Sequence, residues 1–331
     1  MFVYDNGLKL MPSGLAIDFR HRQPFGFISH AHGDHMARHA QAVCTANTSV
    51  IYQRRLGSRC VKVLDYGQPW QLGDTTLTTY PAGHMLGSAM LLAEQNGLRL
   101  LYTGDFQLAS SRTAEPAGTL PRADVLVMES TFGLPRWDFG PRQNQEQRLV
   151  DTVRQSWDSG RAPVVFAYAT GKAQEVTSLL HAAGLRVRVH PAIAEISNAY
   201  RHCGCDLPEP ELYEAPRLAP GEVAIVPPRQ HRGAKFLPCP AGSLKIGVSG
   251  WGLDPRTRHR LEVDVVVPLS DHADFPQLLQ CVEQVQPQIV FCTHGPPEFV
   301  DELRAREFNA FPLDDKSPSL ARRILDGPPN A

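Results

Sequence analysis

The chain has 331 residues, of which 42% are hydrophobic and 20% are charged, and its formal net charge is −1. This length provides for two domains, or for one large domain with an insertion. The near-neutral balance excludes a global basic field, so any attraction to nucleic acid must come from local patches or from bound metals.

The first third of the chain alternates short apolar segments with turns rich in Gly, Pro, Asn and Asp, a pattern typical of β-strands. A short helix is predicted at 49–57. Strands are predicted at 25–29, 43–46, 62–64, 75–80, 89–93, 99–103 and 124–128.

After residue 135 helical spacing appears. Leu149, Val153 and Trp157 share one face of a predicted helix at 143–157. The βαβα rhythm that follows favours a small parallel sheet. We therefore expect an α/β protein, with a β-rich domain at 1–135 and 241–331 interrupted by a smaller α/β cap at 136–240. Strands are predicted at 164–167, 187–190, 223–226, 244–248, 263–267 and 288–292, and helices at 172–183, 192–201, 275–285 and 297–307.

Three features predict a cytoplasmic protein. The seven cysteines are odd in number and form no disulfide framework, which favours a reducing compartment. Residues 1–14 lack the basic and apolar regions of a signal peptide. No apolar run approaches the ~20 residues that span a bilayer, so we expect no membrane partner.

Four metal-ligating side chains lie within six residues, directly after the predicted strand at 25–29. They are His30, His32, Asp34 and His35. Residues i and i+2 of an extended segment project to the same side, so His30 and His32 can face one ion. Burying these groups together would be costly without a cation to pair them. The run therefore predicts a metal site.

Three further candidates each follow a predicted strand and lie beside a glycine, where the backbone can bend toward a buried ion. They are His84, Asp105 and His294. Ligation dominated by imidazole favours zinc, with manganese or iron as alternatives. Two ions bridged by a carboxylate and a water would supply a hydroxide nucleophile at neutral pH. Asp18, at the end of a short apolar segment, is a candidate for orienting a ligand histidine from outside.

The motifs HAHGDH at 30–35, AGH at 82–84 and TGD at 103–105 resemble those of the metallo-β-lactamase superfamily. MEST at 128–131, ATGKAQE at 169–175, SDHAD at 270–274 and THG at 293–295 resemble its β-CASP nuclease branch. The resemblance covers nearly the whole chain. It implies a four-layer αββα sandwich with an inserted β-CASP-like cap.

The resemblance also implies roles for individual residues. The first of two zinc ions would be held by His30, His32 and His84, with Asp105 bridging to the second, which Asp34, His35 and His294 would complete. Glu129 would support His272, which would protonate the leaving oxygen, and Asp18 would brace the site. Asp105, Glu129 and His272 are thus the expected catalytic residues.

Within the branch, MPSGLAIDF, ESTFGLP, FAYATGKAQE, the Gly-Trp at 250–251 and SDHADFP are similar to predicted bacterial exonucleases encoded beside a DNA ligase. This likeness implies an exonuclease on single-stranded DNA in repair, with a DNA ligase or helicase as partner. However, the DNA-repair members of the branch have a small aliphatic residue at the last motif, and this chain has His294, as RNA-processing members do. An RNA-processing endo- or exonuclease therefore stays open, as do a small-thioester or lactam hydrolase and a non-catalytic scaffold.

Substrate contacts are predicted at four positions. Gly171 and Lys172 open a helix after a strand, so the free amides there could bind a phosphate. Arg136 and Arg232 lie in the expected cap or at its joints, where cations would contact the nucleic-acid backbone without regard to sequence.

Overall fold

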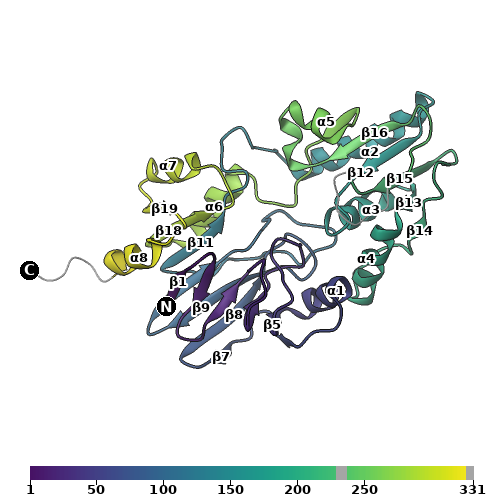
Figure 1. The fold of residues 1–331 in the computed structure, drawn as a ribbon. Coiled ribbons are helices and arrows are strands. Elements are labelled where there is room, and N and C mark those ends of the chain that lie inside the picture. Colours follow the sequence, from purple (N-terminus) through teal and green to yellow (C-terminus); the bar gives the residue numbers. More distant parts are fainter. Residues whose placement is uncertain (229–236, 326–331) are drawn as a thin grey trace, which may run out of the picture. The chain divides into compact units, whose positions relative to one another are not determined.

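The computed structural model describes residues 1–228 and 237–325. Its Cα atoms group into two compact units (Figure 1). Unit 1 comprises Met1–Ser110, Ala114–Asp138 and His272–Ala331, and unit 2 comprises Ser111–Thr113 and Phe139–Asp271. Each unit is described by itself below.

Unit 1 contains two sheets. The first has the order β1-β2-β3-β4-β5-β6, with β3 to β6 parallel to one another. Its strands are β1 (Phe2–Tyr4), β2 (Leu8–Leu10), β3 (Leu15–Ile17), β4 (Phe25–Phe27), β5 (Gln41–Cys44) and β6 (Val61–Val63).

The second sheet of unit 1 has the order β19-β18-β11-β10-β9-β8-β7, and β10, β11, β18 and β19 are parallel. Its strands are β7 (Trp70–Leu72), β8 (Thr75–Pro81), β9 (Ala89–Gln95), β10 (Leu98–Tyr102), β11 (Val125–Glu129), β18 (Ile289–Thr293) and β19 (Ala310–Pro312).

The second sheet is buried on both faces because its strands are apolar at successive positions. Side chains of a strand alternate between faces, so Val125 and Val127 of β11 join one core while Leu126 and Met128 join the other. The first core also holds Leu15, Phe27 and other residues of the first sheet. The two sheets therefore pack face to face, as the αββα prediction requires.

Helices complete the outer layers of unit 1. The second core is closed by α6 (Phe275–Val285) and α7 (Glu298–Arg304), whose buried leucines and phenylalanines face the second sheet. The helix α1 (Ala46–Leu56) contacts β6, and α8 (Ser317–Leu325) contacts β1 and β18. This arrangement confirms the predicted four-layer fold.

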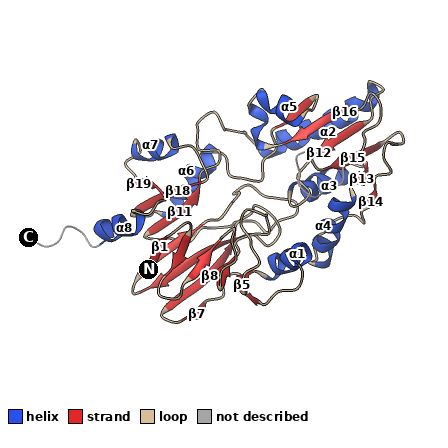
Figure 2. Cartoon of the chain, in the orientation of Figure 1, coloured by secondary structure: helices blue, strands red, loops and turns tan. Residues whose placement is uncertain are grey.

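Unit 2 is built on one all-parallel sheet with the order β14-β13-β15-β12-β16-β17. Figure 2 shows its alternation of strands and helices. Valine and isoleucine on one face pack against α2, α3 and α4. The elements are α2 (Arg142–Asp158), β12 (Pro163–Phe166), α3 (Lys172–Ala182), β13 (Arg186–Val189), α4 (Pro191–His202), β14 (Glu211–Leu212), β15 (Glu222–Val226), β16 (Leu244–Val248), η1 (Gly250–Leu253), α5 (Arg256–Leu261) and β17 (Val265–Val267).

The division of the chain differs from the prediction at its C-terminal boundary. The cap was expected to end at residue 240, but unit 2 extends to Asp271. The reason is pairing: β16 joins β12, and β17 joins β16, so both strands belong to the sheet of unit 2. Within residues 1–228 and 237–325, every helix is too short or too polar to cross a bilayer.

Candidate metal centre

The candidate ligands of unit 1 follow strands whose carboxyl ends lie close together. Because β10, β11 and β18 are parallel neighbours, their carboxyl ends lie at the same edge of the second sheet. Asp105 follows β10, Glu129 ends β11, and His294 follows β18. In the first sheet, Asp18 follows β3 and His30 follows the parallel β4.

Two glycines allow the backbones to approach at this edge. A Cβ on Gly104, whose φ is +56°, would lie 2.8 Å from the Ser29 side chain. A Cβ on Gly295 would lie 1.9 Å from the backbone oxygen of Ser130. Both positions therefore require glycine, which accounts for the glycine beside Asp105 and beside His294.

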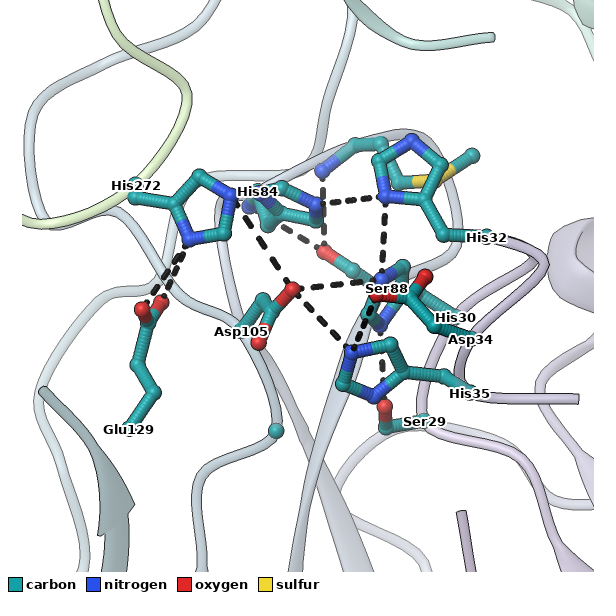
Figure 3. A network of polar contacts seen from close by, with 12 residues as sticks. Ser29, His30, His32, Asp34, His35, His84, Ser88, Asp105, Glu129 and His272 are labelled. Atoms are coloured by element: carbon teal, nitrogen blue, oxygen red, sulfur yellow. Dashed lines mark hydrogen bonds and ion pairs between the residues drawn. The ribbon is translucent and has the colours of Figure 1, made fainter. Parts of the chain in front are cut away.

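One group of donors consists of three histidines and an aspartate. His32 Nδ1 lies 3.1 Å from His30 Nε2 and 3.1 Å from His84 Nε2. Asp105 Oδ2 lies 3.6 Å from His30 Nε2. The ligand atoms of all four residues lie within 4.8 Å of one another. Figure 3 shows these side chains converging.

A second group shares Asp105. His35 Nε2 lies 3.3 Å from Asp105 Oδ2, and His294 completes this group, its ring centroid 5.6 Å from that of His35. Asp34 Oδ2 lies 3.9 Å from His35 Nε2, but the side chain of Asp34 is largely exposed and also faces Arg20. The structure thus brings all seven predicted ligands to one region, with Asp34 at its margin.

The donor set fits a metal cation. Three imidazole nitrogens, His30 Nε2, His32 Nδ1 and His84 Nε2, lie close together. A neutral imidazole has only one N–H donor and one acceptor nitrogen, so hydrogen bonds alone satisfy these three nitrogens poorly. Burial, together with the neighbouring His35 and His84, holds the pKa of His30 well below its usual value, which favours the neutral, ligating form. The rings of His30, His32 and His84 with the Asp105 carboxylate match the nitrogen and oxygen ligands that zinc takes.

Electrostatics around Asp105 agree with this interpretation. Burial alone would raise the pKa of the Asp105 carboxyl, but His35 and His272 hold it well below its usual range. Asp105 is therefore a carboxylate at neutral pH, and it is the one residue common to both donor groups.

Asp18 orients the site from outside. Its carboxylate accepts hydrogen bonds from Ser29 N at 2.7 Å, Ser29 Oγ at 2.5 Å, Tyr102 Oη at 2.8 Å and His35 Nδ1 at 2.8 Å. The bond from Nδ1 leaves His35 Nε2 directed at Asp105. Asp18 has a φ of +52°, a conformation uncommon for a residue with a side chain and one that clusters at functional sites.

Glu129 and His272 form a pair at the same edge. His272 Nδ1 lies 3.0 Å from both oxygens of Glu129, and its Nε2 lies 4.0 Å from Asp105 Oδ2 (Figure 3). Glu129 is buried and also accepts from Phe106 N and Thr131 Oγ1. The carboxylate therefore fixes one ring nitrogen of His272 and leaves the other facing the donor groups.

Three of the four predicted substrate contacts lie within the described residues. Arg136 is exposed and lies over the ring of Trp137, 5.1 Å from its centroid. Lys172 is buried, and its ammonium group pairs with Asp271 at 2.9 Å. The amide of Gly171 donates to Gln174 Oε1 at 2.8 Å. In the structure, neither the ammonium group nor this amide is available to a phosphate. Arg232 lies outside the described residues.

Sequence reasoning missed two supporting residues. Ser29 bridges Asp18 and His30, because its hydroxyl lies 2.9 Å from His30 Nδ1. Tyr102 is buried and donates to Asp18 across 84 residues of sequence. A hydroxyl at the end of an apolar strand, directly before the TGD motif, is the signal that points to Tyr102.

Comparisons with known proteins relate the chain to metallo-hydrolases. Residues 258–308 match the family model described as a Zn-dependent metallo-hydrolase RNA specificity domain. A probable DNA ligase of Opitutus terrae is 36% identical over 331 residues, covering 98% of this chain and 32% of the relative. Endoribonuclease YSH1 of Yarrowia lipolytica is 32% identical over 141 residues, covering 42% of this chain and 16% of the relative. The chain thus spans a third or less of these relatives.

A solved structure shows the same fold. The crystal structure of a protein of unknown function from Enterococcus faecalis V583 matches with a TM-score of 0.58 at 17% identity, over 88% of this chain and 79% of that chain. The αββα layers and the histidine-rich strand ends define a metallo-hydrolase of the metallo-β-lactamase superfamily. With the family match and the relatives, the chain is similar to the β-CASP branch of that superfamily.

Proposed function

We propose that the protein is a zinc-dependent nuclease that hydrolyses phosphodiester bonds of single-stranded DNA as an exonuclease in repair. The observation that carries the proposal is the Glu129–His272 pair, which leaves His272 Nε2 facing Asp105 at 4.0 Å beside two groups of metal donors. Metal ligation alone would fit many hydrolases. A carboxylate-held imidazole beside it supplies the proton that a departing alkoxide needs.

Each group of donors has a task in this proposal. His30, His32 and His84 would hold one zinc, Asp34, His35 and His294 a second, and Asp105 would bridge them; manganese or iron are alternatives. Bound divalent ions supply Lewis acidity and a hydroxide nucleophile at neutral pH.

The residues of the chain move one proton in this scheme. Glu129 accepts the Nδ1–H of His272, which keeps the ring oriented and stabilises its protonated form. His272 Nε2 then gives its proton to the leaving oxygen of the phosphodiester. Asp18 keeps His35 Nε2 directed at the shared carboxylate of Asp105.

DNA as the substrate is supported by the likeness of nearly the whole chain to part of a protein named a probable DNA ligase. We propose on the same ground that the protein works in the cytoplasm beside a DNA ligase or helicase. Addition of such a ligase should increase the yield of sealed product from a nick that carries a single-stranded flap, and no change would count against the partnership.

An RNA-processing endo- or exonuclease is the second candidate. It is favoured by His294 in the second donor group, by the family model described as an RNA specificity domain, and by the likeness to an endoribonuclease. Digestion of matched, end-labelled single-stranded DNA and RNA by one preparation of known metal content separates the two. Cleavage of RNA alone would overturn the proposed substrate, and 5′ against 3′ labels give the polarity.

A further inference from the structure

The last three residues of unit 2 directly precede His272, and buried cations hold each of them. Lys172 Nζ donates to the backbone oxygen of Leu269 at 3.0 Å and pairs with Asp271 Oδ1 at 2.9 Å. Arg142 donates to the backbone oxygen of Ser270 at 2.7 Å. Two side chains from α2 and α3 therefore fix three consecutive residues of the segment Leu269–Asp271.

These contacts matter because the two cations are removed from water. Lys172 is 2% exposed, and the side chain of Arg142 is 9% exposed. A buried ammonium or guanidinium group is costly unless it is paired and hydrogen-bonded. The hydrogen bond and the ion pair of Lys172 are both made with the segment Leu269–Asp271. Moving that segment would therefore leave a buried ammonium group without these partners.

Arg142 is fixed in its turn by carboxylates. Its guanidinium group lies 2.7 Å from Glu175 Oε1 and 3.3 Å from Glu146 Oε1. Glu175 also accepts from Ser111 Oγ at 2.7 Å and from Thr113 Oγ1 at 3.0 Å. The same carboxylate thus binds the short piece Ser111–Thr113, which is the other part of the chain assigned to unit 2. Arg142 therefore bonds to the backbone oxygen of Ser270 with one terminal nitrogen and to Glu175 with the other.

The segment ends at the peptide bond that joins Asp271 to His272. On the far side of that bond, the backbone oxygen of His272 accepts from Gln107 Nε2 at 2.9 Å, and its Nδ1 meets Glu129 at 3.0 Å. A catalytic group must be held closely, since a misplacement of about 1 Å can cost about 100-fold in rate.

We propose that Lys172 and Arg142 are positioning residues for His272. By fixing Leu269–Asp271, they hold the backbone from which His272 reaches Glu129. This inference rests on the proposed role of His272 as proton donor. It gives Lys172, in the ATGKAQE motif, a function in the reaction without contact with the substrate.

The test compares two leaving groups. A polynucleotide releases an alkoxide that needs a proton, whereas a p-nitrophenyl phosphodiester releases a stable phenolate that does not. Lys172→Met should lower kcat on the polynucleotide by about 10- to 100-fold, with KM and the rate on the p-nitrophenyl ester nearly unchanged. Lys172→Arg, which keeps the cation, should restore most of kcat.

A double variant shows whether Lys172 acts through His272. Lys172→Met combined with His272→Ala should cleave the polynucleotide no more slowly than His272→Ala alone, because residues that act as a unit are not additive. Additive losses, or equal losses on both substrates, would show a general structural role and overturn the proposal.

Two further results distinguish failure of the proposed function from failure of the positioning role. If wild type cleaves no phosphodiester, the proposed function fails; if His272→Ala shows the leaving-group effect and Lys172→Met does not, only the positioning role fails. Should Lys172→Met not fold, Arg142→Lys tests the same idea. That variant keeps a cation for Glu175 but loses the guanidinium nitrogen that donates to the backbone oxygen of Ser270. It should therefore also lower kcat on the polynucleotide and not on the p-nitrophenyl ester. If it does not, the inference is contradicted.

Discussion

Asp18 Oδ2 lies 2.8 Å from His35 Nδ1, and this contact decides which nitrogen of His35 is left for a metal. The same carboxylate is held by Ser29 and Tyr102, so its position depends on two neighbouring strand ends and on β10. The orientation of His35 is therefore set by the fold of unit 1.

Asp18→Asn should weaken metal binding by about 10- to 100-fold, because residues that orient a ligand histidine contribute on that scale. Titration with a competing chelator measures the change. Activity should recover at high metal concentration, because the ligands themselves remain. Asp5→Asn, at an exposed position, is the matched control and should titrate as wild type does. An unchanged metal affinity in Asp18→Asn would remove this role.

His35→Ala should abolish cleavage and lower the metal content of the purified protein, since His35 Nε2 lies 3.3 Å from the shared Asp105. Elemental analysis gives the content. His21→Ala replaces an exposed histidine and should retain both the metal and the activity. Equal metal content in the two variants would contradict the second donor group.

Metal removal should also lower the stability of the protein. A ligand present at 1,000 times its Kd adds about 4 kcal/mol to the free energy of unfolding. A chelator should therefore lower Tm, and returning zinc or manganese should restore it. The metal that restores Tm and cleavage together identifies the functional ion. A Tm that does not respond to chelation would argue that the donors hold no ion.

His272→Ala should keep the metal content of wild type and slow cleavage of the polynucleotide by about 100-fold or more, the usual contribution of a general acid. His294→Ala is the informative comparison, since it should lower the metal content instead. Full activity in His272→Ala would exclude His272 from the mechanism.

Glu175→Gln should destabilise the protein in a pH-dependent manner. Burial alone would raise the pKa of Glu175, but Arg142 and hydrogen bonds from Arg112 N and Ser111 hold it below its usual value. A lowered folded-state pKa contributes stability above the unfolded value of about 4.3, and this contribution is lost as the pH falls further.

The stability gap between wild type and Glu175→Gln should thus be about 3 kcal/mol near neutral pH and should narrow below about pH 4.3. Denaturant unfolding at a series of pH values measures the gap, and comparison at each pH cancels effects of metal loss. Glu209→Gln, at an exposed position, should show no gap. A gap that widens in acid would show the sign to be wrong.

The clustering of the candidate metal donors could be predicted from the sequence because each follows a strand and lies in a short motif. The shortest strands, such as β1 and β2, could not, since three residues show no periodicity. The boundary at Asp271 depends on β16 and β17 pairing beside β12, which no local pattern reveals. The sequence also predicted phosphate-binding amides at Gly171 and Lys172, but it could not show the ion pair of Lys172 with Asp271, which lies about a hundred residues further along the chain.

The close approach of Gly295 to Ser130 has a consequence for how this enzyme could diversify. Ser130 N donates to the backbone oxygen of Thr293 at 2.8 Å, and Glu129 pairs in register with Thr293. The contact between these two strand ends is made by main-chain atoms and by Ser130 Oγ, which donates to the backbone oxygen of Thr293 at 3.1 Å. It does not involve the side chain at position 294. The side chain at position 294 can therefore be exchanged, altering the proposed second donor group, while the Glu129 carboxylate keeps its place.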